Sequence, residues 1–355
     1  MWKANFIIVT FRDLLFLHSN KLIMKKKLLL IIPFILILAI VLLIIFRNKI
    51  FHGQEKISLR LGWVSTASFC GEIVGAKMFA EKYNLDLTCV PGGMGINPTL
   101  MVQSGENTFG TLAADEVISA IDNGADLVII GVINYYSPGG FVSLKENNIV
   151  KPQDLIGKSV GILPFGSTNL LYEIMLKKNK IDRSKISEIP VSYDLKPFIS
   201  GSYDVQPVFV YDETVTLDLK NIEYNLIEPK NYGVSIKGPV YFCKRETLEK
   251  NPELVKAFVY AMADGWNYAI NHKNESIKML KEFAPEIDVN RESMVLEKAV
   301  PYYSGYNNQP INSDYQSWED MINQLYELRV IKEKYDVKKI VYLDFVHEYY
   351  EEKQQ

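Results

Sequence analysis

Four short segments combine small, hydroxyl, aromatic and acidic residues in the way that a small-molecule site requires. Each segment follows a predicted strand, and in open α/β sheets ligands lie outside the carboxyl ends of the strands. Helices that begin there also offer free backbone N–H groups. The candidate ligand-binding residues are Trp63, Ser65, Thr66, Gly92, Gly93, Met94, Gly166, Ser167, Thr168, Asn169, Tyr211, Asp212 and Glu213. The pattern predicts a site for a small organic molecule.

Each candidate in the first two segments also has a purely structural interpretation. Trp63 either stacks on a flat ligand ring or covers the hydrophobic core. Ser65 and Thr66 either donate to a ligand or cap the helix that follows. Gly92 and Gly93 either let the backbone approach a ligand or simply form a turn.

The later segments leave the same choice. Residues 166–169 place a glycine and hydroxyl groups at a helix start, which suits an anionic or acceptor group but also suits simple capping. Asp212 and Glu213 either accept from an amino or ring N–H group or are first-turn charges that the helix dipole favours. Trp266 lies in the middle of a predicted helix and is expected in the core.

Alternating strands and helices are predicted to position these segments. Strands are expected at 57–63, 85–89, 108–112 and 127–132, and then at 158–162, 186–191, 203–210, 226–227 and 240–242. Helices are expected at 71–83, 98–104, 115–124, 166–178, 194–200 and 253–271. This alternation predicts an α/β fold with mostly parallel sheets and helices on both faces.

The N-terminal part carries the signal of a membrane segment. Residues 28–46 are nineteen apolar residues without a charge, which as a helix would span about 28 Å. Three lysines at 25–27 predict that residues 1–27 stay in the cytoplasm and that the rest lies outside. An uncleaved anchor and a cleaved signal peptide both fit, although no small-x-small cleavage site follows. Residues 1–23 precede Met24, and we interpret them as the result of a start codon assigned upstream of the true one.

The composition excludes several classes of protein. With a net charge of −3 in 355 residues there is no basic excess for nucleic acid. Cys70, Cys89 and Cys243 lack metal-ligand spacing, so neither a metal nor a cofactor is expected. The cysteines are interpreted as buried, with a single disulfide as the alternative.

Three sequence blocks carry a resemblance to a known family. The blocks are Pro91, Gly92, Gly93, Gly95, Ile96, Asn97 and Pro98 with Gln103, Ser104 and Gly105; Pro152, Asp154, Leu155, Gly157, Lys158, Val160 and Gly161; and Ala261, Gly265, Trp266, Tyr268 and Ala269. In this order, and behind an export signal, they resemble the nitrate/sulfonate/thiamine-precursor class of ABC transporter substrate-binding proteins. The resemblance covers about 57–284.

The resemblance implies a two-lobed type 2 periplasmic-binding fold, whose chain crosses twice between the lobes. Lobe one would comprise 55–137 and 238–355, and lobe two 140–234. The crossings would fall near residues 136–140 and 237–239, where glycine and proline suit defined hinge torsions.

The implied function is to deliver a small organic ligand to an ABC permease and its ATPase by closing the cleft around it. A thiamine-precursor pyrimidine is the first expectation for the ligand, and a sulfonate or other small anion the second. A membrane-tethered sensor is an alternative. Another is a related enzyme class that makes the thiamine pyrimidine from its own histidine and carries a cysteine-rich iron motif. None of His18, His52, His272 and His347 lies in a predicted ligand loop, so a binding protein is favoured over an enzyme.

Overall fold

The computed structural model describes residues 55–164 and 166–354. The predicted cytoplasmic segment at 1–27 and the membrane segment at 28–46 lie outside the described residues. Within the described ranges, no helix combines the length and the apolar character that a bilayer crossing needs.

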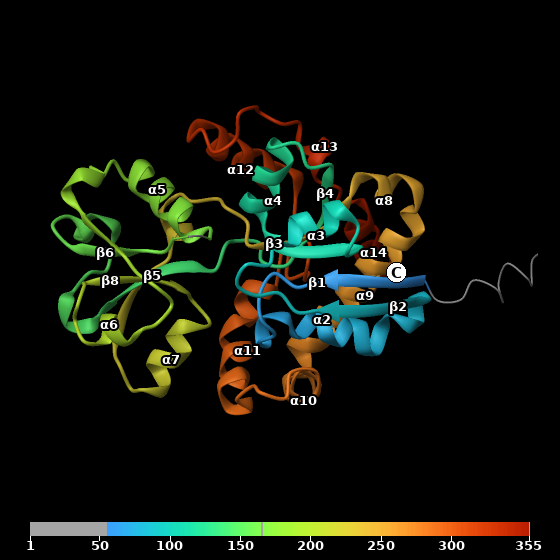
Figure 1. Ribbon diagram of the computed structural model, residues 1–355, viewed down its shortest axis with the longest axis horizontal. Coiled ribbons are helices and arrows are strands. Elements are labelled where there is room, and N and C mark those ends of the chain that lie inside the picture. The colour runs from blue at the N-terminus through green and yellow to red at the C-terminus, as the bar shows by residue number, and fades with distance from the viewer. Residues whose placement is uncertain (1–54, 165, 355) are drawn as a thin grey trace, which may run out of the picture. The chain divides into compact units, whose positions relative to one another are not determined.

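The first lobe is built on a five-stranded sheet in the order β2-β1-β3-β10-β4. Its strands are β1 (Glu55–Arg60), β2 (Leu85–Val90), β3 (Phe109–Ala113), β4 (Leu127–Val132) and β10 (Pro239–Lys244). The strands β1 and β3 are parallel, whereas β10 is antiparallel to both β3 and β4. The strand β10 comes from a distant part of the chain, after the strands of the second lobe, which Figure 1 shows apart from β1–β4.

The second lobe has its own five-stranded sheet, in the order β7-β6-β8-β5-β9. Its strands are β5 (Gly139–Leu144), β6 (Ser159–Ile162), β7 (Ser187–Pro190), β8 (Val205–Phe209) and β9 (Tyr224–Ile227). The strand β6 is parallel to β7 and β8, and β5 is antiparallel to β8 and β9. Both sheets are therefore mixed, and the prediction of mostly parallel sheets is wrong for the strands that follow a crossing. Each of the strands β5 and β10 begins at the edge of its sheet that faces the other lobe. The neighbouring strands end at that edge, so β5 and β10 run antiparallel to them.

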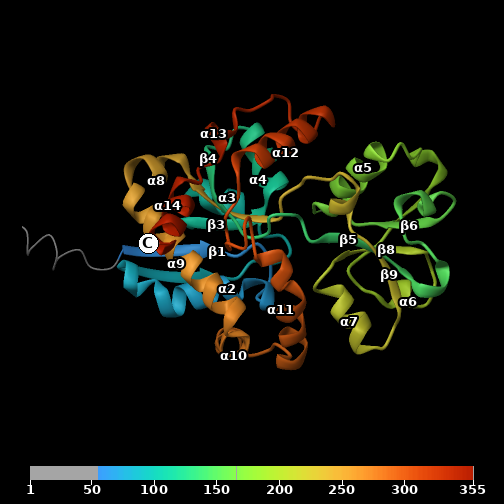
Figure 2. The ribbon, with the colours of Figure 1, turned by 180° about the vertical axis from the view of Figure 1, so that it is seen from behind.

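Helices cover both sheets (Figure 2). They are α2 (Cys70–Val74), α3 (Pro98–Ser104), α4 (Ala114–Asp122), α5 (Thr168–Lys178), α6 (Lys196–Ile199), α7 (Glu213–Leu219), α8 (Arg245–Lys250), α9 (Pro252–Asn271), α10 (Lys273–Phe283), α11 (Val289–Tyr303), α12 (Tyr315–Glu327), α13 (Val337–Ile340) and α14 (Asp344–Gln354). The predicted start of α3 is confirmed, since the side chain of Asn97 accepts from the backbone N–H groups of Thr99 and Leu100. Three-residue and four-residue 3₁₀ turns supplement these helices.

The helix predicted at 71–83 is confirmed as a helical segment, but it is not one regular α-helix. The chain forms α2, then a π-helical segment η2 (Gly75–Phe79), and then a 3₁₀ turn η3 (Glu81–Tyr83). Gly71 and Gly75 let this segment lie directly against α9, because a Cβ atom at Gly71 would lie 2.0 Å from the ring of Trp266. The glycines that permit this contact also weaken the preference for a regular helix.

The core of the first lobe extends between α2, α9 and the sheet. Trp266 is 1% exposed, which confirms its predicted place in the core. Cys70, Cys89 and Cys243 are all buried free thiols, so the buried interpretation is confirmed and the disulfide alternative is wrong.

Two segments at 133–138 and 228–238 connect the lobes and bond to each other. The backbone N–H of Gly238 donates to the carbonyl of Asn134 at 2.9 Å, and that of Ser137 donates to Ile236 at 2.8 Å. Beside them the ammonium of Lys237 lies 3.4 Å from the centre of the Tyr135 ring. The two crossings are therefore joined to each other by backbone hydrogen bonds.

Candidate functional site

A cavity of about 570 Å³ is lined by loops of both lobes, and we call it the cleft. Most of the predicted site residues line it: Trp63, Thr66, Gly93, Met94, Gly166, Ser167, Thr168, Tyr211, Asp212 and Glu213. The two crossings form its floor through Asn134, Ser137, Pro138, Gly238 and Pro239. The structure therefore gathers segments from four separate strand ends around one cavity.

Three predicted residues do not line the cleft. Ser65 is buried. A Cβ atom at Gly92 would lie 2.2 Å from the carbonyl oxygen of Leu61, so this glycine allows neighbouring segments to approach each other rather than a ligand. The side-chain amide of Asn169 donates to the carbonyl of Leu163 at 2.5 Å and faces a separate, smaller cavity.

The wall from lobe one is aromatic and apolar. Trp63 follows β1 and is 38% exposed, so it does not cover the core. Its ring centre lies 6.2 Å from that of Tyr193, which belongs to lobe two. Met94 is 78% exposed at the same wall. Thr66, in contrast, accepts from the backbone N–H of Ser68 and so caps the 3₁₀ turn η1 (Ala67–Phe69), as its structural interpretation required.

The wall from lobe two presents two helix N-termini, and the second of them carries acidic residues. Thr168 begins α5 and Glu213 begins α7. A carboxylate oxygen of Glu213 accepts from the backbone N–H of Phe209 at 2.7 Å. Asp212 forms an ion pair with Arg291 from α11 of lobe one. One ion pair therefore already joins the two lobes at the edge of the cleft.

The cleft is lined by acidic residues, and burial raises the pKa of two of their carboxyl groups toward neutral pH. Burial, with Asp212 beside it, raises the pKa of Glu213 to about 7. Burial likewise raises the pKa of Glu116, in the first turn of α4, to about 7. Among the described residues that line the cleft, Arg291 is the only basic one. The site therefore favours a ligand that donates hydrogen bonds or carries positive charge.

The cleft residues that sequence reasoning missed include Glu116, Asn134, Tyr193 and Arg291. Glu116 and Tyr193 lie in or near strand-to-helix connections, so the rule that selected Trp63 could have found them. Asn134 belongs to a crossing, and Arg291 to α11, where the sequence resemblance has faded. Arg291 does not follow a strand in the predicted pattern, and Asn134 follows the predicted strand at 127–132 but lies in a crossing rather than at a helix start.

The described histidines lie elsewhere. His272 and His347 do not line the cleft. No group of three or more histidine, cysteine, aspartate or glutamate side chains in the described ranges is placed to hold a metal ion.

The structure has two mixed β-sheets covered by helices, two crossings of the chain between the lobes, and a cavity lined by loops of both lobes. These features define the two-lobed periplasmic-binding fold. The model of the NMT1/THI5-like family matches residues 75–276, which is more than half of the chain. This chain belongs to that family.

A curated relative and two solved structures show how far the similarity extends. The 4-amino-5-hydroxymethyl-2-methylpyrimidine phosphate synthase of Legionella pneumophila is 21% identical over 290 residues, which cover 80% of this chain and 90% of that protein. The periplasmic sulfonate-binding protein SsuA of Methylobacillus flagellatus KT superposes with a TM-score of 0.66 at 15% identity, covering 85% of this chain and 96% of that one. The periplasmic nitrate-binding protein NrtA of Synechocystis PCC 6803 gives a TM-score of 0.61 at 10% identity, covering 84% and 88%. At such identities the structural likeness establishes the fold alone.

Proposed function

We propose that this protein binds a small organic solute in the cleft and delivers it to an ABC permease and its ATPase. The observation that carries the proposal is that loops of both lobes, with Trp63 on one side and Ser167 and Glu213 on the other, line a single cavity. A ligand that contacts both walls stabilises the closed arrangement by its greater affinity for it. The lobes would be 55–137 with 238–355, and 140–234, hinged at the crossings.

The lining favours an amino-substituted pyrimidine, of the kind that serves as a thiamine precursor, over a sulfonate. Trp63 and Tyr193 bring an aromatic ring from each wall, with the ring centres 6.2 Å apart, against which a flat ligand ring can pack. Glu116 and Glu213 offer carboxyl groups to amino or ring N–H groups. A sulfonate would find one guanidinium, that of Arg291, which is already paired with Asp212 and Glu292.

A thermal-shift measurement on the full-length protein in detergent tests the proposal. We expect 4-amino-5-hydroxymethyl-2-methylpyrimidine at a hundred times its Kd to add about 2.7 kcal/mol to the free energy of unfolding. Ethanesulfonate serves as the competing probe. A shift with ethanesulfonate alone would replace the pyrimidine by a sulfonate, and no shift with either probe would count against solute binding of both kinds.

The Legionella relative favours a second candidate, a pyrimidine synthase. The chemistry implied by the related enzyme class would require a histidine at the reacting centre, and neither described histidine lines the cleft. Mass spectrometry of the protein and of the pyrimidine distinguishes a binding protein from a synthase. A binding protein returns the pyrimidine unchanged and keeps its own mass, whereas a protein that consumes its own histidine loses mass.

The proposed location is the extracytoplasmic side of the cell membrane, with residues 28–46 as the anchor. Protease added to intact spheroplasts should then digest the binding domain and leave a short membrane-bound fragment. Full protection of the domain would place it on the other side.

A further inference from the structure

Two buried polar side chains line the cleft without a hydrogen-bond partner in the described ranges 55–164 and 166–354. They are the amide of Asn134, through both its oxygen and its nitrogen, and the hydroxyl of Thr168. Asn134 is 0% exposed and Thr168 is 2% exposed. Buried polar groups are almost always paired, because burial removes the hydrogen bonds that water would supply. Two unpaired groups at one cavity therefore need an explanation.

The two side chains border the same segment of the floor. A Cβ atom at Gly238 would lie 2.5 Å from Cβ of Asn134 and 3.2 Å from Cδ of Pro138. At the next residue, a Cβ atom on Gly139 would lie 3.5 Å from the methyl group of Thr168. Asn134 from lobe one and Thr168 from lobe two thus both lie beside the crossing at residues 138–139 and line the same cavity.

The side chain of Asn134 does not hold the crossing together. The bond between the crossings uses the backbone carbonyl of Asn134, which accepts from the N–H of Gly238. A buried asparagine with a structural role looks different in this protein. The amide of Asn225 donates to Ser143, Leu144 and Lys145, each at 3.2 Å.

We propose that Asn134 and Thr168 bind the edge of the ligand that reaches the cleft floor, and that this edge carries a hydrogen-bond donor next to an acceptor. A primary amide offers N–H and C=O side by side, so it pairs with an amino group beside a ring nitrogen, or with an amide or ureide. A sulfonate has acceptors only and would leave the Asn134 oxygen unpaired in a buried site. This inference rests on the proposed solute-binding function and defines the ligand class more narrowly.

The test uses three variants of the full-length protein: Asn134→Leu, Thr168→Val and the control Asn225→Leu. The probes are 4-amino-5-hydroxymethyl-2-methylpyrimidine, the same compound without its amino group, and ethanesulfonate. Calorimetric titration gives the affinity, and the unfolding temperature of the unliganded protein gives the stability.

For wild type we expect the amino compound to bind about 10-fold more tightly than its desamino analogue, and Asn134→Leu to lose about that factor. Thr168→Val should lose a smaller factor. Unliganded Asn134→Leu should unfold at the wild-type temperature or above it, because an apolar side chain of similar shape replaces an unpaired polar one. Asn225→Leu should unfold at a clearly lower temperature.

Three results would overturn the inference. The first is wild-type affinity in Asn134→Leu, which leaves solute binding intact but removes the amide from it. The second is binding of ethanesulfonate alone, which leaves the function intact but excludes the donor–acceptor edge. The third is an unfolding temperature of Asn134→Leu as low as that of Asn225→Leu, which shows a structural amide whichever probe binds. If no probe binds wild type, the proposed ligand fails, and this stability comparison still decides the role of Asn134.

Discussion

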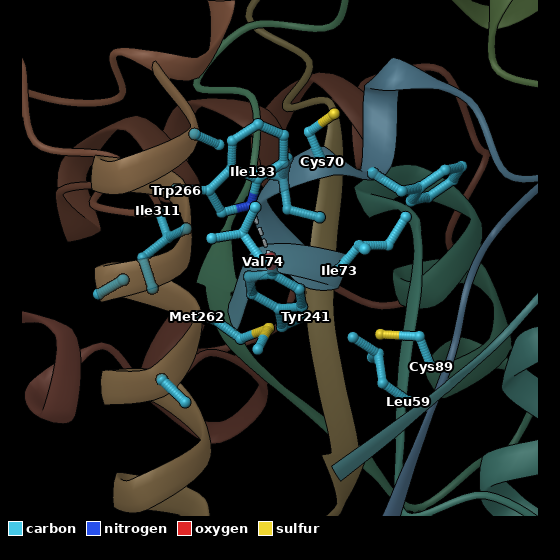
Figure 3. Close-up of a cluster of buried hydrophobic side chains, with 14 of the residues drawn as sticks. Leu59, Cys70, Ile73, Val74, Cys89, Ile133, Tyr241, Met262, Trp266 and Ile311 are labelled. Atoms are coloured by element: carbon cyan, nitrogen blue, oxygen red, sulfur yellow. Dashed lines mark hydrogen bonds between the residues drawn. The ribbon is translucent and has the colours of Figure 1, made fainter. Parts of the chain in front are cut away.

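Two regions of the molecule differ in how they pair buried polar groups: the hydrogen-bonded chain where α2 packs on α9, and the cleft. In the first region the indole N–H of Trp266 donates to the hydroxyl of Tyr241 at 2.7 Å (Figure 3). That hydroxyl in turn donates to Glu72 at 2.8 Å. In the cleft, Asn134 and Thr168 have no partner among the described residues. The second carboxyl oxygen of Glu72 also has no partner among the described residues, but it lies in the packed core, whereas Asn134 and Thr168 line a cavity and are available to a ligand. Variants in the first region should therefore cost stability, and variants in the second should cost binding.

Loss of Trp266 should have the largest effect on stability. Trp266→Ala removes a side chain that is 1% exposed and leaves a cavity against Gly71, so we expect a loss of about 3–5 kcal/mol in the free energy of unfolding. Chemical denaturation measures it. Ligand affinity of the folded fraction should not change, and a loss of affinity without a loss of stability would reverse the comparison.

Removal of the Tyr241 hydroxyl should cost less. Tyr241→Phe deprives both the indole N–H of Trp266 and the carboxyl of Glu72 of a partner, so the expected loss is about 2 kcal/mol. Burial raises the pKa of Glu72 to about 8. The same denaturation experiment checks this prediction, and wild-type stability in Tyr241→Phe would show that the hydroxyl does not support the lobe.

Glu213→Gln should weaken ligand binding and spare the fold. The glutamine oxygen can still accept from the N–H of Phe209, while the negative charge that a ligand amino group would face is lost. We expect about a 10-fold lower affinity for the amino-pyrimidine. The matched control is Glu223→Gln, an exposed acid of the same lobe. Equal affinities in the two variants would remove Glu213 from the site.

The pH dependence should reveal the same carboxyl group through two opposite trends. The pKa of Glu213 is raised from 4.5 to about 7, so the folded protein retains a proton that the unfolded chain has already released. The contribution of Glu213 to stability is thus present below pH 4.5 and is lost as the pH rises to about 7. Affinity for a ligand that binds the carboxylate should rise over the upper part of this range, by at most about 10-fold per pH unit. Titration at pH 6 and pH 8 measures the effect. The change should be smaller in Glu213→Gln, which keeps only one of the two cleft carboxyl groups with a pKa of about 7, that of Glu116, and an identical slope in both proteins would contradict the prediction.

Local patterns were sufficient to predict most strands and the positions of the cleft walls. The strand predicted at 127–132 matches β4, and Asn97 with Pro98 marked the start of α3. Such features depend on residues close together in the sequence. The direction of β5 and β10 depends instead on where the chain returns from the other lobe, which local periodicity does not encode.

The sequence could identify strand-end loops but not which of their side chains face the cavity. Gly92 and Gly93 look equivalent in sequence, yet Gly92 meets the carbonyl of Leu61 whereas Gly93 lines the cleft. The sequence could not identify Asn134 as a site residue, because its proposed role depends on the folded structure leaving its side-chain amide without a hydrogen-bond partner among the described residues. Arg291 reaches the cleft from α11, whose position follows from the packing of the first lobe.

The fluorescence of Trp63 tests the central claim most directly, because this residue is partly exposed at the cleft whereas Trp266 and Trp318 are fully buried. Titration of the full-length protein with 4-amino-5-hydroxymethyl-2-methylpyrimidine should give a saturable change in emission whose midpoint agrees with calorimetry. The change should disappear in Trp63→Phe while most of the binding heat remains. Binding heat with no change in Trp63 emission would place the ligand outside the cleft and contradict the account.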